Sequence, residues 1–326
     1  MLAEPPALFR CRLTLRLLED AALPALKGPL LRGGFGYAFQ ESSCPQPCWR
    51  RSDQCRVEAI CPYRWIFETP RPPGQYPLHD LRDIPRPFVI TPLVDPRTYY
   101  PAGSTLDLEL VLIGRSIQWL PFFILAFERF ARGGLGRDNA RTRLERVEAL
   151  EPWGVTGPVI FQDGRAFTRD TGWPIIDGAI VAAQAAALPP DLRLSFVTPL
   201  RLKHQGRLLD SFDLPAIVQA LCWRITALAT FHDDGAWEVD YEALIAQARS
   251  VKVEPEGQRW EDRSRPSRHG GATHAMEYGG LIGSAVLRGV PDHLRALLLI
   301  GTQTHLGKAC VFGNGALRLT PCSRRK

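Results

Sequence analysis

Apolar and charged residues alternate along several segments of the chain, and a period of two is typical of half-buried strands. The clearest examples are residues 9–20, 104–115 and 192–203. Residues 116–132 and 212–232 instead carry apolar side chains at the spacing of a helix that buries one face. The pattern therefore predicts a protein in which strands alternate with helices.

The first half of the chain reads as strand, helix, irregular segment, strand, helix, glycine-rich turn and strand. The strand at 9–20 precedes a helix that starts after Pro29. Residues 69–101 hold nine prolines, which excludes a central strand or a long helix throughout that segment. The strand at 104–115 and the helix at 116–132 then lead through GGLGR into another strand.

The second half repeats this order. A hairpin that turns at Asp163 and Gly164 precedes the strand at 192–203 and the helix at 212–232. Two strands that we expect to pair with each other come next. A further helix begins at Pro291 and is followed by a glycine-rich loop and a last strand.

Both halves approximate the β-α-β-β-α-β unit of ferredoxin-like folds, and in both a glycine loop joins the second helix to the last strand. We therefore predict an α+β fold with two tandem ferredoxin-like domains. The first spans residues 1–155 and contains a cysteine-rich insertion at 44–61. The second spans residues 156–326 and contains the glycine-rich loop at 301–315.

The second glycine loop, THLGKACVFGNG, is the first candidate for a binding site. A phosphate loop of nucleotide hydrolases needs four residues between its glycines and a Ser or Thr after its Lys, but Ala309 follows Lys308. The dinucleotide-binding fingerprint needs a strand before its glycines, whereas a helix precedes them here. Glycine N–H groups and Lys308 still suit a polyanion, with Phe312 as a stacking face. The alternative is a plain helix-to-strand turn.

The charge of the chain is also compatible with a polyanion as partner, but it does not establish one. The net charge is +6 and the pI is about 9.0, which is compatible with a nucleic-acid partner and also with many mildly basic enzymes. Residues 259–271 (RWEDRSRPSRHGG) gather four Arg, one Trp and one His. A charged loop that only faces solvent is the alternative.

Four of the eight cysteines lie within eighteen residues, at Cys44, Cys48, Cys55 and Cys61. In a reducing compartment such clustering favours a metal over disulfides, and four thiolates form a closed tetrahedral site of the kind that holds structural zinc. The spacing differs from the paired Cys-x2-Cys of common zinc ribbons. Four thiols without a metal are therefore the alternative.

The N-terminus lacks a basic start followed by an apolar core, so no secretory signal is expected. We find no run of eighteen or more uncharged apolar residues of the kind that spans a membrane. The sequence therefore predicts a cytoplasmic protein without a membrane partner.

The order and spacing of several motifs resemble the RAMP superfamily of CRISPR proteins. Within it, the chain is similar to the "Cas six" endoribonucleases, which cut precursor CRISPR RNA in its repeats. The resemblance runs through most of the chain in the segments LRGGFGYAF, CPYRWIFE, PRPFVITP, LVLIGRSIQWLPFFILAFERFARGGLGR, FVTPLRLK, RWEDRSRPSRHGG, GGLIGSAVLRG and HLGKACVFGNG.

This resemblance implies cleavage of CRISPR repeat RNA without a metal or other cofactor. The 2′-hydroxyl beside the scissile phosphate attacks it and leaves a 2′,3′-cyclic phosphate and a 5′-hydroxyl. Such chemistry needs a base, an acid and a cation near the phosphate. One alternative is a non-catalytic RAMP subunit that holds CRISPR RNA beside other effector subunits. A more distant one is a small zinc-dependent RNA-binding module with no link to CRISPR.

The resemblance also implies roles for single residues. His305 belongs to the family's glycine-loop motif and is expected to act as general acid or base. The first-domain segment where many relatives carry a catalytic His has none here. The alternative is that His305 caps the helix or binds RNA without catalysis. Lys308 is expected to stabilise the phosphate and Tyr278 to donate a proton or stack. The expected RNA contacts are Gly307, Phe312, Gly313, Asn314, Gly315, Arg32, Arg201, Lys203, Arg263, Arg265, Arg268, His269 and His274.

Overall fold

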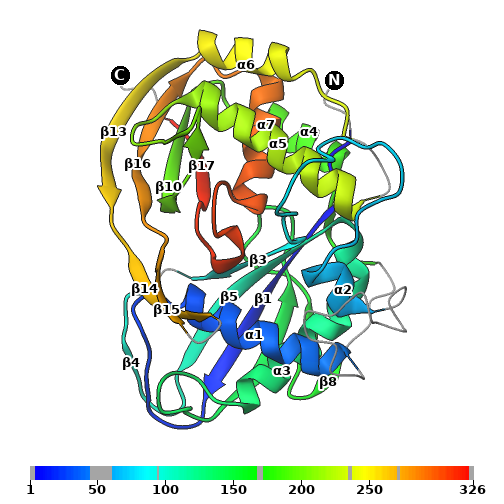
Figure 1. Ribbon diagram of the computed structural model, residues 1–326, viewed down its shortest axis with the longest axis vertical. Coiled ribbons are helices and arrows are strands. Elements are labelled where there is room, and N and C mark those ends of the chain that lie inside the picture. The colour runs from blue at the N-terminus through cyan, green and yellow to red at the C-terminus, as the bar shows by residue number, and fades with distance from the viewer. Residues whose placement is uncertain are drawn as a thin grey trace. The chain divides into compact units, whose positions relative to one another are not determined.

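The computed structural model describes residues 4–44, 61–93, 95–166, 172–233, 237–269 and 272–322, and for residues 265–269 and 272–276 it describes the backbone alone. The chain divides into two compact units, each with its own antiparallel sheet (Figure 1). The N-terminal unit comprises Pro6–Ile176 and Ala227–Ala236. The C-terminal unit comprises Met1–Pro5, Asp177–Thr226 and Trp237–Lys326.

Four neighbouring strands of the N-terminal sheet have the order β3-β5-β1-β6, which is the order of a ferredoxin-like fold. Helix α1 (Gly28–Ser43) follows β1, and α3 (Leu120–Arg132) joins β5 to β6 through a 3-10 turn, η3 (Gly114–Trp119). Each predicted strand and helix of this half is therefore confirmed. The strands are β1 (Leu8–Leu17), β3 (Phe88–Pro92), β5 (Thr105–Ile113) and β6 (Thr142–Ala149).

The proline-rich segment contributes only an edge strand to this sheet. β3 lies at the end of the strand order and pairs with β5, so its outer N–H groups need no partner strand. The N-terminal unit also holds short elements outside this sheet. They are β2 (Ala21–Ala22), α2 (Pro62–Phe67) and β4 (Tyr99–Tyr100).

The N-terminal unit continues past residue 155, where the sequence pattern placed the domain boundary. The hairpin of β7 (Val159–Gln162) and β8 (Arg165–Ala166) extends the sheet from β6, and β9 (Ile175–Ile176) pairs with β1. The Asp163-Gly164 turn joins β7 to β8 as predicted. Backbone pairing thus ties residues 159–166 and 175–176 to the first sheet, which periodicity alone does not reveal.

Aromatic side chains fill the space between this sheet and its helices. Phe35 of α1 stacks on Phe127 of α3, with ring centroids 4.4 Å apart, and both rings are fully buried. The two helices approach closely because Gly34 has no side chain. A Cβ atom at Gly34 would lie 2.1 Å from Cε2 of Phe130. One glycine of the LRGGFGYAF motif is therefore explained by helix packing.

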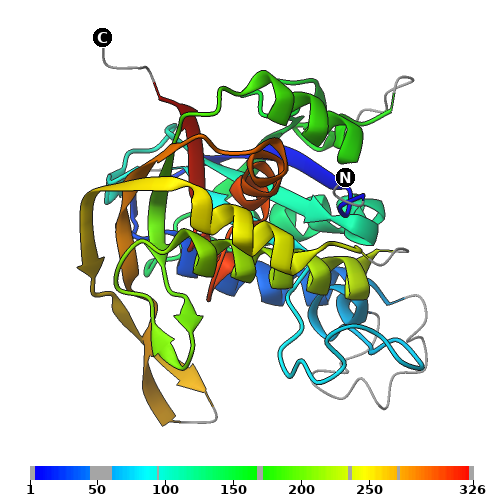
Figure 2. The ribbon, with the colours of Figure 1, turned by 90° about the horizontal axis from the view of Figure 1, so that it is seen from above.

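The C-terminal unit has the strand order β13-β16-β10-β17, the same ferredoxin-like order as the first sheet. Helices α5 (Leu214–His232) and α7 (Asp292–Thr304) cover one face of it (Figure 2). The prediction of two tandem ferredoxin-like folds is confirmed. The strands are β10 (Leu192–Leu200), β13 (Lys252–Glu261), β16 (Gly280–Arg288) and β17 (Leu317–Pro321).

β13 and β16 pair with each other as predicted, but the connection between them is longer than a simple turn. It forms a second hairpin of β14 (Ser264–His269) and β15 (Ala272–Glu277). A smaller hairpin, β11 (Lys203–His204) with β12 (Arg207–Leu208), follows β10. Two further helices were not predicted from the sequence, and they are α4 (Gly178–Ala187) and α6 (Tyr241–Ser250).

Helix α5 is the one described helix whose length and composition would allow it to cross a membrane. Its apolar window is 67% buried within the protein, which is the mark of a core helix. Leu221, Ile225 and Leu228 are fully buried along it. The helix is therefore explained by packing.

Candidate nucleic-acid interface

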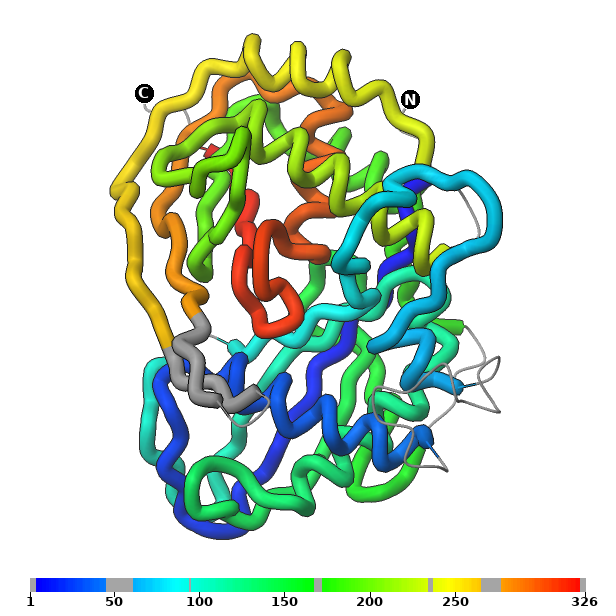
Figure 3. The backbone as a smooth tube through the Cα atoms, viewed as in Figure 1, coloured from blue at the N-terminus to red at the C-terminus, as the bar shows by residue number. Residues whose placement is uncertain are grey.

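The glycine loop runs from the end of α7 to β17 and folds back on itself, in red in Figure 3. A short 3-10 turn, η4 (Cys310–Phe312), lies at its middle. Backbone hydrogen bonds fix both sides of the loop. Leu306 N donates to Gly315 O (3.0 Å), Gly315 N donates to Pro199 O (3.1 Å), and Lys308 N donates to Arg201 O (2.9 Å). The loop is thus strapped to the end of β10.

Two of its glycines are required by contacts within the protein. Gly307 has φ +84°, and a Cβ atom there would lie 2.7 Å from Arg201 O. Gly315 has φ +66°, and its Cβ atom would lie 1.7 Å from Leu306 O. A side chain at either position would collide with backbone that cannot move aside. The sequence suggested a close approach to a polyanion, whereas the approach described here is to the chain itself.

His305 is the C-cap residue of α7 and is turned into the protein. Its side chain is 4% exposed, and its backbone has φ +57°, a conformation that non-glycine residues rarely adopt. Ring atom Nδ1 lies 3.1 Å from Asn314 O, so Nδ1 carries the proton and donates it. Burial lowers the pKa of His305 to about 4, although the hydrogen bond to Asn314 opposes the shift and the charge of Arg224 adds to it.

These observations favour the helix-capping alternative for His305 over proton exchange with RNA. At neutral pH the ring is neutral, and its Nδ1 proton is engaged within the loop. A general acid or base works best with a pKa near the operating pH.

Two residues that the sequence did not single out hold the glycine loop and the end of α7 in place. Arg224 of α5 donates to Thr304 O at 2.7 and 2.9 Å, and Thr198 Oγ1 donates to Gly313 O at 2.7 Å.

Residues 194–317, which contain this loop, match the family model of the CRISPR-associated endoribonuclease Cas6. Residues 6–171 match a model described as an N-terminal domain. The C-terminal part of the chain is therefore similar to the Cas6 family. No curated protein is similar enough in sequence to match it.

Solved structures with the same fold include Cas6 proteins. A Cas6 product complex covers 97% of this chain and 100% of its own, with a TM-score of 0.54 and 17% identity. A Thermus thermophilus Cas6 matches with a TM-score of 0.52 and 16% identity over 97% of this chain and 99% of its own. A partial Cas6-RT-Cas1–Cas2 complex covers all of this chain with a TM-score of 0.59 and 13% identity. The present chain spans 48% of that longer protein.

The cations expected from the Cas6 motif differ in their surroundings. Lys308 and Lys203 are exposed, the first on the glycine loop and the second on β11. Arg201 is mostly buried, and its guanidinium donates to Gly279 O (3.3 Å) and to Glu277 (3.0 Å). Since Lys308 N bonds to Arg201 O, the structure brings the loop and the β10–β11 junction together. Lys308 and Lys203 are therefore exposed positive charges in this region, and Arg207 of β12 is a third.

The remaining predicted contacts are mixed. Phe312 is partly buried. Asn314 was expected to contact RNA, but its side chain is buried and donates a hydrogen bond to Tyr278 O. Tyr278 is 9% exposed. Arg263 donates to Glu261 at 2.5 Å. The side chains of Arg265, Arg268, His269 and His274 lie outside the described part of the chain, although their backbones form β14 and β15.

Arg32, predicted as an RNA contact, is packed in the N-terminal unit. Its guanidinium carbon lies 4.8 Å from the ring centroid of Phe67 and 5.6 Å from that of Phe88. Burial, with a smaller effect from the charge of Arg86, lowers the pKa of Arg32 to about 10. The side chain therefore stays a cation at neutral pH and is held against aromatic faces, which differs from the surface contact expected from the sequence.

The cysteine cluster is described only in part. Cys44 is the C-cap residue of α1, and Cys61 is the N-cap residue of α2. Cys48 and Cys55 lie outside the described residues. Within the described ranges, no group of three His, Cys, Asp or Glu side chains is placed to hold a metal ion. Four thiolates suit zinc chemically, and zinc binding by these cysteines stays a prediction.

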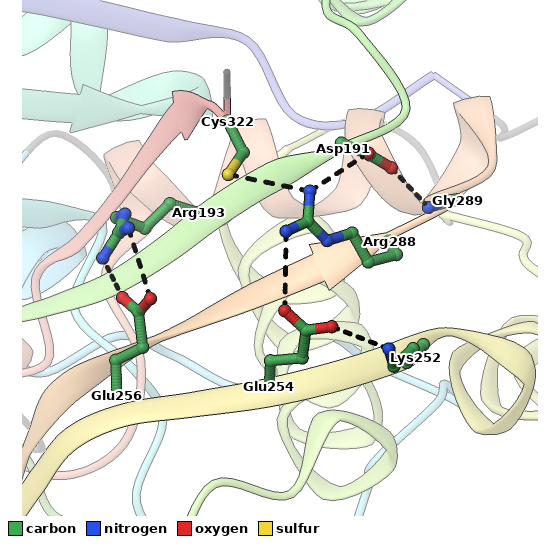
Figure 4. Close-up of polar contacts among 8 residues, drawn as sticks. All are labelled: Asp191, Arg193, Lys252, Glu254, Glu256, Arg288, Gly289 and Cys322. Carbon is green, nitrogen blue, oxygen red and sulfur yellow. Dashed lines mark hydrogen bonds and ion pairs between the residues drawn. The ribbon is translucent and has the colours of Figure 1, made fainter. Parts of the chain in front are cut away.

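The open face of the C-terminal sheet carries charges that pair with one another (Figure 4). Arg193 of β10 pairs with Glu256 of β13, and Arg288 of β16 pairs with Asp191 (3.2 Å) and Glu254 (3.5 Å). Carboxylates beside each basic group repel phosphate and occupy its donors. These ion pairs therefore disfavour this face as the RNA-binding surface. The glycine loop and the two hairpins, β11–β12 and β14–β15, are the better candidates.

Proposed function

We propose that the chain is an endoribonuclease that cuts CRISPR precursor RNA within its repeats. The observation that carries the proposal is the Cas6 family match over residues 194–317, because it includes the glycine loop on which Lys308 is exposed. A basic chain with net charge +6 suits a phosphate-rich substrate. Lys308 and Lys203 supply positive charge on the loop and on the hairpin beside it.

The reaction that suits these groups is attack by the RNA's own 2′-hydroxyl on the adjacent phosphate. The O2′–P bond forms as the P–O5′ bond breaks, which gives a 2′,3′-cyclic phosphate and a 5′-hydroxyl. One proton leaves O2′ and one joins O5′, and we propose that no metal ion takes part. Lys308 would neutralise charge on the phosphate. We propose that His305 holds the loop in place. Proton transfer is then the role of His269, His274 or bound water.

RNA repeats that form stems are recognised by shape, phosphates and 2′-hydroxyls, and bases are read where they are unpaired. The β14–β15 hairpin carries Arg265 and Arg268, and Arg263 lies at its base. We propose that this hairpin and the β11–β12 hairpin contact the repeat, while the glycine loop meets the phosphate that is cut.

The second candidate is a non-catalytic subunit that holds CRISPR RNA for an effector or adaptation complex. The burial of His305 favours it, because it removes the proton-transfer group expected from the motif. The similarity to a partial Cas6-RT-Cas1–Cas2 complex is compatible with such an assembly.

Incubating the purified chain with labelled repeat RNA in excess EDTA separates the two. The repeats are transcribed from the CRISPR arrays of the genome that encodes the chain. Cleavage at one position, with filter binding in the same buffer, supports the endoribonuclease. Tight binding without cleavage, with or without added Mg²⁺, supports the holding subunit.

A further inference from the structure

The side chain of Asn314 connects the glycine loop to the base of the β14–β15 hairpin. Its Nδ2 donates a hydrogen bond of 2.8 Å to Tyr278 O, thirty-six residues earlier in the chain, and the bond is buried. The backbone carbonyl oxygen of Asn314 accepts the bond from His305 Nδ1 at 3.1 Å. One residue thus joins the end of α7, the loop and the hairpin.

The carbonyl of Tyr278 lies where the hairpin leaves the sheet. Tyr278 N and Gly279 N both donate to Arg263 O, at 2.9 and 3.1 Å, and β14 begins directly after Arg263. A Cβ atom at Gly279 would lie 2.3 Å from Glu261 O, so the two chains are in close contact at this point. The position of Tyr278 O therefore sets where the hairpin starts.

A second link joins the same parts of the molecule from the other side. The Arg201 guanidinium donates to Gly279 O and pairs with Glu277, while Arg201 O accepts from Lys308 N. The hairpin base is thus bonded on either side of Tyr278 to residues that also hold the glycine loop. A helix-to-strand turn can close without any bond to the hairpin. These two links to the hairpin base therefore call for another explanation.

We propose that Asn314 is a positioning residue that fixes the β14–β15 hairpin relative to the glycine loop. The proposal rests on the proposed function, in which the hairpin contacts RNA and Lys308 meets the scissile phosphate. The buried amide is matched to this role, because its N–H group faces a carbonyl that would otherwise lack this donor. Misplacing the hairpin would leave RNA bound but displaced from Lys308, and small displacements reduce rates steeply.

The test compares Asn314→Asp and Asn314→Ala with Thr198→Val. The Asp variant keeps the shape of Asn but places an oxygen against Tyr278 O. Thr198→Val is the matched control, because Thr198 Oγ1 bonds Gly313 O and accepts from Ala316 N, and so holds the loop to β10 without touching the hairpin. Amide hydrogen exchange is measured without RNA at Tyr278 and Gly279, and single-turnover cleavage and affinity are measured with repeat RNA.

Both Asn314 variants should speed exchange at Tyr278 and Gly279, and should slow cleavage by about tenfold or more with a smaller change in affinity. Thr198→Val should leave exchange at these two amides unchanged, even if it lowers the melting temperature as much as the Asn314 variants do. Equal exchange in all three variants would overturn the proposal. If the wild-type chain does not cut RNA, the proposed function fails, and the exchange comparison still decides whether Asn314 positions the hairpin. If Asn314→Ala does not fold, Asn314→Asp and an Arg201→Gln variant provide the same exchange comparison.

Discussion

The imidazole Nδ1 of His305 lies 3.1 Å from the carbonyl oxygen of Asn314, and this bond closes the glycine loop at the end of α7. The ring makes this bond while the His305 backbone holds φ +57° and ψ 177°. Such a conformation favours glycine, and a non-glycine residue there stores about 1–3 kcal/mol of strain. The ring of His305 thus supplies a hydrogen bond at a position whose backbone conformation alone would favour glycine.

This strain predicts that His305→Gly is more stable than His305→Ala. Both variants lose the ring and its bond to Asn314, but only Gly relieves the backbone, by about 1 kcal/mol or more. Urea unfolding of the two proteins measures the difference in the free energy of unfolding. A more stable Ala variant would contradict the strain.

The pKa of His305 predicts how stability depends on pH. The folded-state pKa is about 4, below the ordinary value of 6.5, so the unfolded chain binds the extra proton between these values. The contribution of the neutral ring is fully present above pH 6.5 and is lost as the pH falls toward 4, on the order of 3 kcal/mol in total. Thermal unfolding at pH 7 and pH 5 should show a larger loss for the wild type than for His305→Gln. Equal losses would show that the ring is not buried neutral.

Lys308 should act as a phosphate contact. Lys308→Ala removes one contact, which should weaken RNA binding and reduce the slope of log K against log salt by about one. Lys252→Ala is the matched control, since it removes the same charge from the sheet face, where Lys252 pairs with Glu254 at 2.8 Å. Filter binding at several salt concentrations measures both slopes. A similar change in the two variants would mean that net charge, and not position, decides.

The cysteine cluster predicts one zinc ion per chain, bound by Cys44, Cys48, Cys55 and Cys61 through sulfur atoms at about 2.3 Å. Elemental analysis of protein purified without chelator should give stoichiometric zinc. The double variant Cys48→Ser with Cys55→Ser should lose it, whereas Cys322→Ser should not. Protein without stoichiometric metal would support the alternative of four thiols.

The fold could be predicted from the sequence because its signals are local. Period-two alternation predicted β1, β5 and β10, and the nine prolines of residues 69–101 excluded a central strand there, where the structure has the edge strand β3 and the short strand β4. The recurrence of a glycine loop before the last strand pointed to the ferredoxin-like unit in both halves. Helix α4 was missed because its alanine-rich sequence has little amphipathic pattern.

The site was less predictable because its contacts join distant parts of the chain. The motif identified His305 and Lys308 but could not show that the ring of one is buried and the side chain of the other exposed. Arg201 looked like a phosphate contact, yet Glu277 and Gly279 occupy its guanidinium. Arg224 and Thr198 carry no local signal, since their partners lie eighty or more residues away.

The central claim is that the RNA's own 2′-hydroxyl makes the cut. The direct measurement is single-turnover cleavage in EDTA of two repeat RNAs, one of them with a single 2′-deoxy nucleotide immediately 5′ of the cleaved phosphate. We predict that the unmodified RNA yields a 2′,3′-cyclic phosphate and a 5′-hydroxyl, and that the deoxy RNA is bound with similar affinity but stays intact. Cleavage of the deoxy RNA, a requirement for Mg²⁺, or products with a 3′-hydroxyl and a 5′-phosphate would contradict it.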